Sequence, residues 1–116
     1  MSIVAIVLTA LVALLHAGFL VLEMFLWTTP FGRRTFRLSE EKARETAVLA
    51  ANQGLYNGFL AAGLAWGLLL QDRAICLFFL GCVVVAGVFG AATVKRSILF
   101  VQAVPAIFAA VAVHYF

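Results

Sequence analysis

Charged residues are scarce in this chain of 116 residues, at 11% of the sequence, whereas hydrophobic residues make up 66%. A soluble domain of this size could not bury so much apolar surface, so the composition argues against an ordinary globular protein and indicates a lipid bilayer as the solvent. The net charge of +3 is therefore assigned to loops on one membrane face. We do not expect a nucleic acid as a partner.

Cysteine and histidine are also few, at two residues each. Cys76 and Cys82 lie six positions apart in one apolar segment and on different faces of a helix, so a disulfide between them is not expected. No group of side chains has the spacing of a zinc site. We expect no metal and no other cofactor.

Short polar interruptions divide the chain into four apolar segments. The first is the one substantial loop, from Thr28 to about Ser39, in which we interpret Pro30-Phe31-Gly32 as a turn that ends the first helix. The other two are short turns at Gln71-Asp72-Arg73 and Val94-Lys95-Arg96-Ser97. The sequence predicts an antiparallel four-transmembrane-helix bundle, a single domain over residues 1–116. Its helices are expected at about 2–27, 40–70, 74–93 and 98–116.

Three local signals refine this outline. The first segment lacks the basic start and small-residue cleavage site of a signal peptide, so we expect it to remain as a mature helix. Ser39 is suited to cap the second helix, with Glu40 and Arg44 paired across one turn. Pro105 removes a hydrogen bond to the carbonyl near Val101 and is expected to bend the last helix.

Basic residues set the expected orientation. One side of the predicted bundle carries Arg33, Arg34, Arg37, Lys42, Arg44, Lys95 and Arg96, and the other side carries only Arg73. The positive-inside rule then places the basic side in the cytoplasm. We expect a multi-pass protein of the bacterial inner (plasma) membrane with both termini outside.

A polar stretch interrupts the second apolar segment. It contains four polar side chains, Asn52, Gln53, Tyr56 and Asn57. Each unpaired amide in hydrocarbon costs on the order of several kcal/mol of free energy, so these side chains need hydrogen-bond partners within the protein. The candidates at similar depth are His16 and Glu23 in the first segment, with Thr93 and Gln102 near the last turn. We expect one polar cluster in the cytoplasmic half of the bundle, with Trp27 at the interface beside it.

The same segment carries small residues on one face. At about 100° per residue, Gly54, Gly58, Ala61 and Ala65 form a strip suited to close helix contact, separate from a bulky face. A four-helix bundle of this size is thin. We therefore expect a homo-oligomer that associates through its small-residue faces.

Glu23 is the strongest functional candidate because an ionisable residue within a membrane costs roughly 2.5–3.5 kcal/mol to insert. It can act as a proton donor or acceptor. His16 and Tyr56 are the candidate relays, which would make these three the catalytic residues of an enzyme. Asn52, Gln53, Asn57, Thr93, Gln102 and Trp27 are the candidate ligand-binding residues. Each amide also has a structural interpretation, as a hydrogen-bonding contact between helices.

Three stretches of the sequence resemble a family of small four-helix bacterial membrane proteins that is catalogued as a domain of unknown function. They are the opening from Leu15 to Arg33, the central motif from Asn52 to Gly63, and the tail containing Gly90-Ala91-Ala92-Thr93, Gln102 and Pro105-Ala106. The resemblance implies a four-helix membrane protein and supplies no activity.

Three functions stay open at this point. The first is binding or carriage of a hydrophobic or amphipathic small molecule, with Glu23 coupling binding to protonation. The second is a membrane-embedded acid–base enzyme, an isomerase or cyclase acting on a lipid or isoprenoid. The third is a structural or assembly subunit whose amides only join helices. Membrane lipid is an expected partner in each case.

Overall fold

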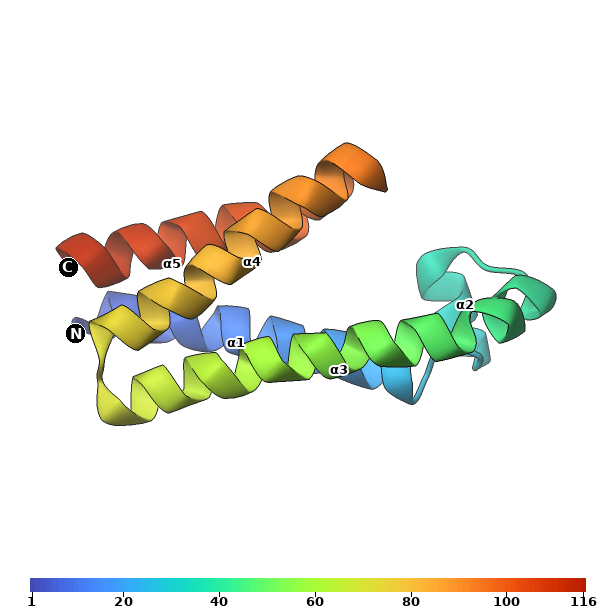
Figure 1. The fold of residues 1–116 in the computed structure, drawn as a ribbon, viewed down its shortest axis with the longest axis horizontal. Coiled ribbons are helices and arrows are strands. Elements are labelled where there is room, and N and C mark those ends of the chain that lie inside the picture. Colours follow the sequence, from blue (N-terminus) through green and yellow to red (C-terminus); the bar gives the residue numbers. More distant parts are fainter. The chain divides into compact units, whose positions relative to one another are not determined.

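The computed structural model describes residues 1–116, and all of its regular structure is helical (Figure 1). The elements are α1 (Ile3–Met24), α2 (Pro30–Phe36), α3 (Glu40–Leu70), α4 (Arg73–Thr93), the π-helical turn η1 (Leu99–Ala103) and α5 (Val104–Tyr115). The all-helical fold class is therefore confirmed. The chain forms two compact units, one made of Met1–Leu14 with Leu60–Phe116 and the other of Leu15–Phe59.

The first unit has an apolar core to which four helices contribute. Its buried residues come from the start of α1, the end of α3, and from α4 and α5: Ala5, Val12, Leu64, Cys76, Leu80, Val83, Ala106, Ala109, Ala112 and Val113. Small side chains are frequent in this set. They let helix backbones approach closely, which is the usual way that apolar helices pack in the absence of a hydrophobic driving force.

The turn between α3 and α4 within this unit is short and hydrogen-bonded. Gln71 adopts the left-handed conformation with φ of 49°. Asp72 caps α4, because its carboxylate accepts a hydrogen bond from the Ile75 N–H at 3.1 Å. The polar turn predicted at these positions is therefore present.

The last helix contains a local irregularity just before Pro105. Residues Leu99–Ala103 form a π-helical turn, in which the Val104 N–H donates to the Leu99 carbonyl five residues earlier. Proline cannot donate to the carbonyl of Val101, and a π-helical turn is one way for a helix to accommodate that loss. The bend predicted at Pro105 stays a prediction, and the π-helical turn before it was not predicted from the sequence.

The second unit contains a short helix that the sequence interpretation did not include. Pro30-Phe31-Gly32 was interpreted as a turn, but Pro30 is the first residue of α2. Thr29 caps this helix by accepting a hydrogen bond from the Gly32 N–H at 3.2 Å. Proline is well suited to the first helical position because its missing N–H would have no helical partner there. Pro30 therefore starts a helix, whereas the expected first helix already ends at Met24.

The start of α3 agrees with the sequence prediction. The Ser39 hydroxyl accepts a hydrogen bond from the Lys42 N–H at 3.1 Å. Arg44 and Glu40 form an exposed ion pair at 3.7 Å. Such a pair contributes only about 0.3–0.5 kcal/mol, so the cap matters more than the ion pair in fixing where α3 begins.

Two helices, α1 and α4, are long and apolar enough to cross a membrane by length and composition. Helix α3 is longer, at 31 residues, but its charged first turns and the amides near its middle interrupt the apolar sequence. The helical stretch Leu99–Tyr115 is apolar but shorter. The structure thus contains two helices that meet this criterion, compared with the four that the sequence predicts.

The contact between Gly87 and Ala103 gives a test of the packing in the first unit. A Cβ atom at Gly87 would lie 2.7 Å from the Ala103 backbone nitrogen, whereas a Cβ at Gly81 on the same helix meets nothing within 4 Å. We expect Gly87→Ala to lower the free energy of unfolding by about 1–3 kcal/mol through overpacking. The measurement is denaturant unfolding of the purified protein in detergent.

Gly81→Ala is the matched control, because it makes the same chemical change on α4 in open space. Its higher helix propensity should leave stability unchanged or raise it by up to about 1 kcal/mol. Equal destabilisation by both substitutions would contradict the close contact at Gly87.

Candidate functional site

A carboxylate–amide pair joins α1 to α3 within the unit Leu15–Phe59. The Asn57 Nδ2 group donates a hydrogen bond to Glu23 Oε1 at 2.5 Å. Asn57 is 5% exposed, and Glu23 is partly buried. Burial makes the loss of either partner of this hydrogen bond costly. These two residues are the core of the candidate site.

Two glycines of α3 bring the helices close enough for this bond. A Cβ at Gly54 would lie 2.7 Å from Met24 Cγ and 3.1 Å from Glu23 Cβ. A Cβ at Gly58 would lie 2.5 Å from Leu20 Cδ1. The first part of the predicted small-residue strip therefore forms a helix contact, and α1 and α3 lie side by side here (Figure 1). A larger side chain at Gly54 would also meet the Leu20 backbone oxygen and Glu23 Cβ and so separate the helices, whereas at Gly58 only the end of the flexible Leu20 side chain would have to move.

His16 is fully buried, two helical turns before Glu23 on α1. Its ring packs edge-on against Phe19, with centroids 5.2 Å apart and an interplanar angle of 72°. Residues seven apart lie close to one helix face, so the histidine and the glutamate follow one line along α1. Neither residue is on the fully exposed side of the helix.

The other polar residues of the central motif are arranged differently. Asn52 and Gln53 are exposed. Tyr56 is 55% exposed, and its ring packs against Phe59 at a centroid distance of 6.0 Å. Within this unit the structure brings Asn57 to Glu23 and leaves the other three polar side chains of the motif on the accessible surface.

Trp27 has a partner that the sequence did not indicate. Its indole Nε1 donates a hydrogen bond to Thr46 Oγ1 at 3.0 Å, and its ring packs against Phe36 at 4.7 Å. The Thr46 hydroxyl in turn donates to the Lys42 carbonyl at 2.8 Å. Trp27 therefore holds the segment that contains α2 against the start of α3. Neither Thr46 nor Phe36 carries a sequence signal for this role, since both are common residues in ordinary positions.

Thr93 and Gln102 belong to the other unit. Thr93 lies exposed at the end of α4, and its hydroxyl donates to the Phe89 carbonyl at 2.7 Å. Gln102 is partly buried within η1. A cluster that unites them with Glu23 stays a prediction. The residues that come together within one unit are Glu23 and Asn57.

The fold and the site define a small helical protein with two helices suited to membrane crossing and a carboxylate–amide pair between α1 and α3. The chain belongs to the family described as "Protein of unknown function (DUF1304)", whose model matches residues 10–114. This match confirms the resemblance seen in the sequence. It covers both Glu23 and Asn57.

One curated relative is similar over most of its length. The chain is 28% identical over 106 residues to "Uncharacterized protein YpaA" of Lactococcus lactis subsp. lactis (strain IL1403), which covers 88% of this chain and 89% of the relative. No solved structure matches the chain. The function must therefore be argued from the residues of the site.

A double-mutant cycle tests the carboxylate–amide pair. We expect Glu23→Ala and Asn57→Ala to show a coupling energy of about 0.6–1.7 kcal/mol in the free energy of unfolding, the range for hydrogen bonds between helices in membranes. The measurement is denaturant unfolding of the single and double variants in detergent.

Asn52→Ala combined with Glu23→Ala is the control cycle, because Asn52 is exposed on the same helix. Its coupling energy should be within about 0.5 kcal/mol of zero. Equal coupling in both cycles would show that Glu23 interacts with the whole motif and would contradict a specific pair with Asn57.

Proposed function

We propose that this protein is a multi-pass protein of the bacterial inner membrane that binds or carries a hydrophobic or amphipathic small molecule, with Glu23 coupling binding to protonation. The observation that carries the proposal is the hydrogen bond between Asn57 and Glu23. It places an ionisable group between two helices that are otherwise mainly apolar.

The surface of the chain supports a membrane location. Large apolar side chains are exposed along α1 and α4, with Leu14 at 68% and Val85 at 69% exposure. Within the most apolar 18-residue stretch of α1 and of α4, only 22% of the residues are buried in the protein. The core helix of a soluble protein would be mostly buried, and soluble monomers rarely expose apolar patches above a few hundred Å². Lipid is the solvent that suits such helices.

The proposed topology has four spans, with α3 and the helical stretch Leu99–Tyr115 crossing beside α1 and α4. The positive-inside rule places α2 and the turn after α4 in the cytoplasm and both termini outside. Polar residues in α3 are compatible with a span when they face other helices, as Asn57 does. Self-association of the bundle stays a prediction.

A carboxyl group in this position has a cost that argues for a function. Inserting an acidic residue into a membrane costs roughly 2.5–3.5 kcal/mol of free energy. One hydrogen bond between helices stabilises the protein by typically about 0.6 kcal/mol, which is much less. An amide pair would join the same helices at a lower cost. Asn57 engages one carboxylate oxygen, and Glu23 keeps some accessible surface. The group can therefore take up a proton or contact a ligand while it stays oriented by Asn57.

Binding is better supported than catalysis by the same geometry. An acid–base enzyme needs a relay from Glu23 through His16 or Tyr56. Tyr56 is exposed and packs against Phe59, and His16 packs against Phe19. The contact of Asn57 with Glu23 suits a binding group that is held in place.

The proposal predicts that binding of a lipophilic cation depends on pH. With tetraphenylphosphonium as the probe, affinity should rise with pH, because the cation favours the ionised carboxylate and competes with one proton. The dissociation constant should change by up to about tenfold per pH unit over the range where Glu23 titrates. Glu23→Gln should remove this dependence. The measurement is titration calorimetry on the purified protein in detergent at several pH values.

Glu40→Gln is the control, because Glu40 is an exposed acid in the first turn of α3. It should keep the pH dependence of the wild type. An unchanged dependence in Glu23→Gln would contradict proton coupling. Absence of binding by the wild type across lipophilic cations and neutral amphiphiles would leave the helix-joining role, which the double-mutant cycle measures separately.

A further inference from the structure

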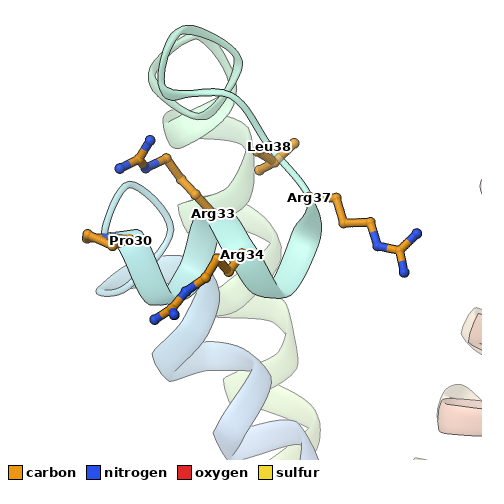
Figure 2. Close-up of a pocket in the computed structure, with 5 residues that line it drawn as sticks. All are labelled: Pro30, Arg33, Arg34, Arg37 and Leu38. Carbon is orange, nitrogen blue, oxygen red and sulfur yellow. The ribbon is translucent and has the colours of Figure 1, made fainter.

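The residues around α2 form a second feature, separate from the Glu23 site. A shallow surface hollow, open to its surroundings, is lined by Pro30, Arg33, Arg34, Arg37 and Leu38 (Figure 2). Three of these five residues carry a positive charge, and none carries a negative charge. The hollow lies entirely within the unit Leu15–Phe59.

The positive charges of this hollow are not neutralised within the chain. The ion pair in the structure is that of Arg44 with Glu40, which does not involve the lining residues. In addition, Arg33 Nε is buried and has no hydrogen-bond partner. A buried donor on a charged group is costly to leave unpaired. The unneutralised positive charges of the lining residues favour an anionic ligand.

The side chains distinguish two sides of α2. Figure 2 shows Arg33 and Arg34 extending on the side of Pro30, whereas Arg37 extends on the opposite side. Arg37 follows the helix in the left-handed conformation, with φ of 55°, and this turns the chain away from the line of α2. Arg33 and Arg34 are therefore the two arginines on the side of Pro30, and their guanidinium groups extend in different directions (Figure 2).

Apolar groups beside the arginines indicate which anion fits. Pro30 and Leu38 line the hollow, and Phe31 on α2 is 56% exposed. A free anion gains nothing from these groups, whereas a phospholipid presents a phosphate together with acyl chains. Basic residues interleaved with apolar ones are typical of segments at the interface of a membrane that contains anionic lipid.

We propose that the hollow beside α2 is a binding site for the headgroup phosphate of an anionic phospholipid such as phosphatidylglycerol. Arg33 and Arg34 on the side of Pro30 attract the phosphate, and arginine suits this role because the planar donors of one guanidinium group can bind phosphate in pairs. Pro30, Phe31 and Leu38 contact the upper part of the acyl chains. This lipid site does not include Glu23. The experiment that tests it is therefore independent of the test of the proposed small-molecule site.

The test measures lipid retained by the purified full-length protein. The protein in detergent is supplied with equal amounts of phosphatidylglycerol and phosphatidylcholine, and the bound lipids are counted by native mass spectrometry. The wild type should retain phosphatidylglycerol preferentially. Each arginine near the surface contributes about fivefold, so Arg33→Gln with Arg34→Gln should weaken retention roughly 25-fold. Arg37→Gln should have a smaller effect than either of these two substitutions.

Arg73→Gln with Arg96→Gln is the matched control, because it removes the same net charge at two exposed arginines outside this unit. It should retain phosphatidylglycerol as the wild type does. Arg33→Lys with Arg34→Lys keeps the charge and should restore part of the retention, and circular dichroism checks that every variant is helical.

Three outcomes would overturn the proposal. The first is equal retention of the two lipids by the wild type. The second is an equal loss in the Arg33/Arg34 variant and in the control variant, which would show a general charge effect. The third is displacement of phosphatidylglycerol by inorganic phosphate at equal concentration, which would show that the site takes a phosphate ion without the lipid.

Discussion

Close contact between helices at positions without a side chain is the constraint on which this structure depends. In one unit, α1 packs closely against α3 at Gly54 and Gly58. In the other unit, η1 packs closely against α4 at Gly87. Small residues let helix backbones approach closely, so that van der Waals contact at short range joins the helices. The bond between Asn57 and Glu23 exists because the glycines allow that approach. The chemistry of the site therefore follows from the packing of the helices.

The sequence predicted most elements whose signals are local. The Ser39 cap and the turn at Asp72 each depend on a few neighbouring residues, and both are present. The helix α2 was missed because proline can either end a helix or begin one. Thr29 decides between the two, since its hydroxyl caps the helix that Pro30 starts. The bond from Trp27 to Thr46 could not be predicted, because it joins residues 19 positions apart without any pattern.

The sequence predicted which residues belong to the candidate site better than it predicted which of them are in contact. Glu23 was identified from its cost in lipid, and Asn57 from the unusual polarity of the motif around it. The sequence could not show which of the four polar side chains in the motif meets Glu23. That depends on the rotation of α3 about its axis, and in the structure Gly54 and Gly58 face α1 together with Asn57. This rotation leaves Asn52, Gln53 and Tyr56 accessible.

The π-helical turn at Leu99–Ala103 affects how the last helix can be compared between relatives. A turn closed by a bond to the fifth residue holds one residue more than an α-helical turn. The faces of α5 are therefore displaced by about 100° relative to those of an uninterrupted helix that starts at the same place. A homologue lacking one residue in this stretch could keep every contact of α5 and show the difference only as a gap in the alignment.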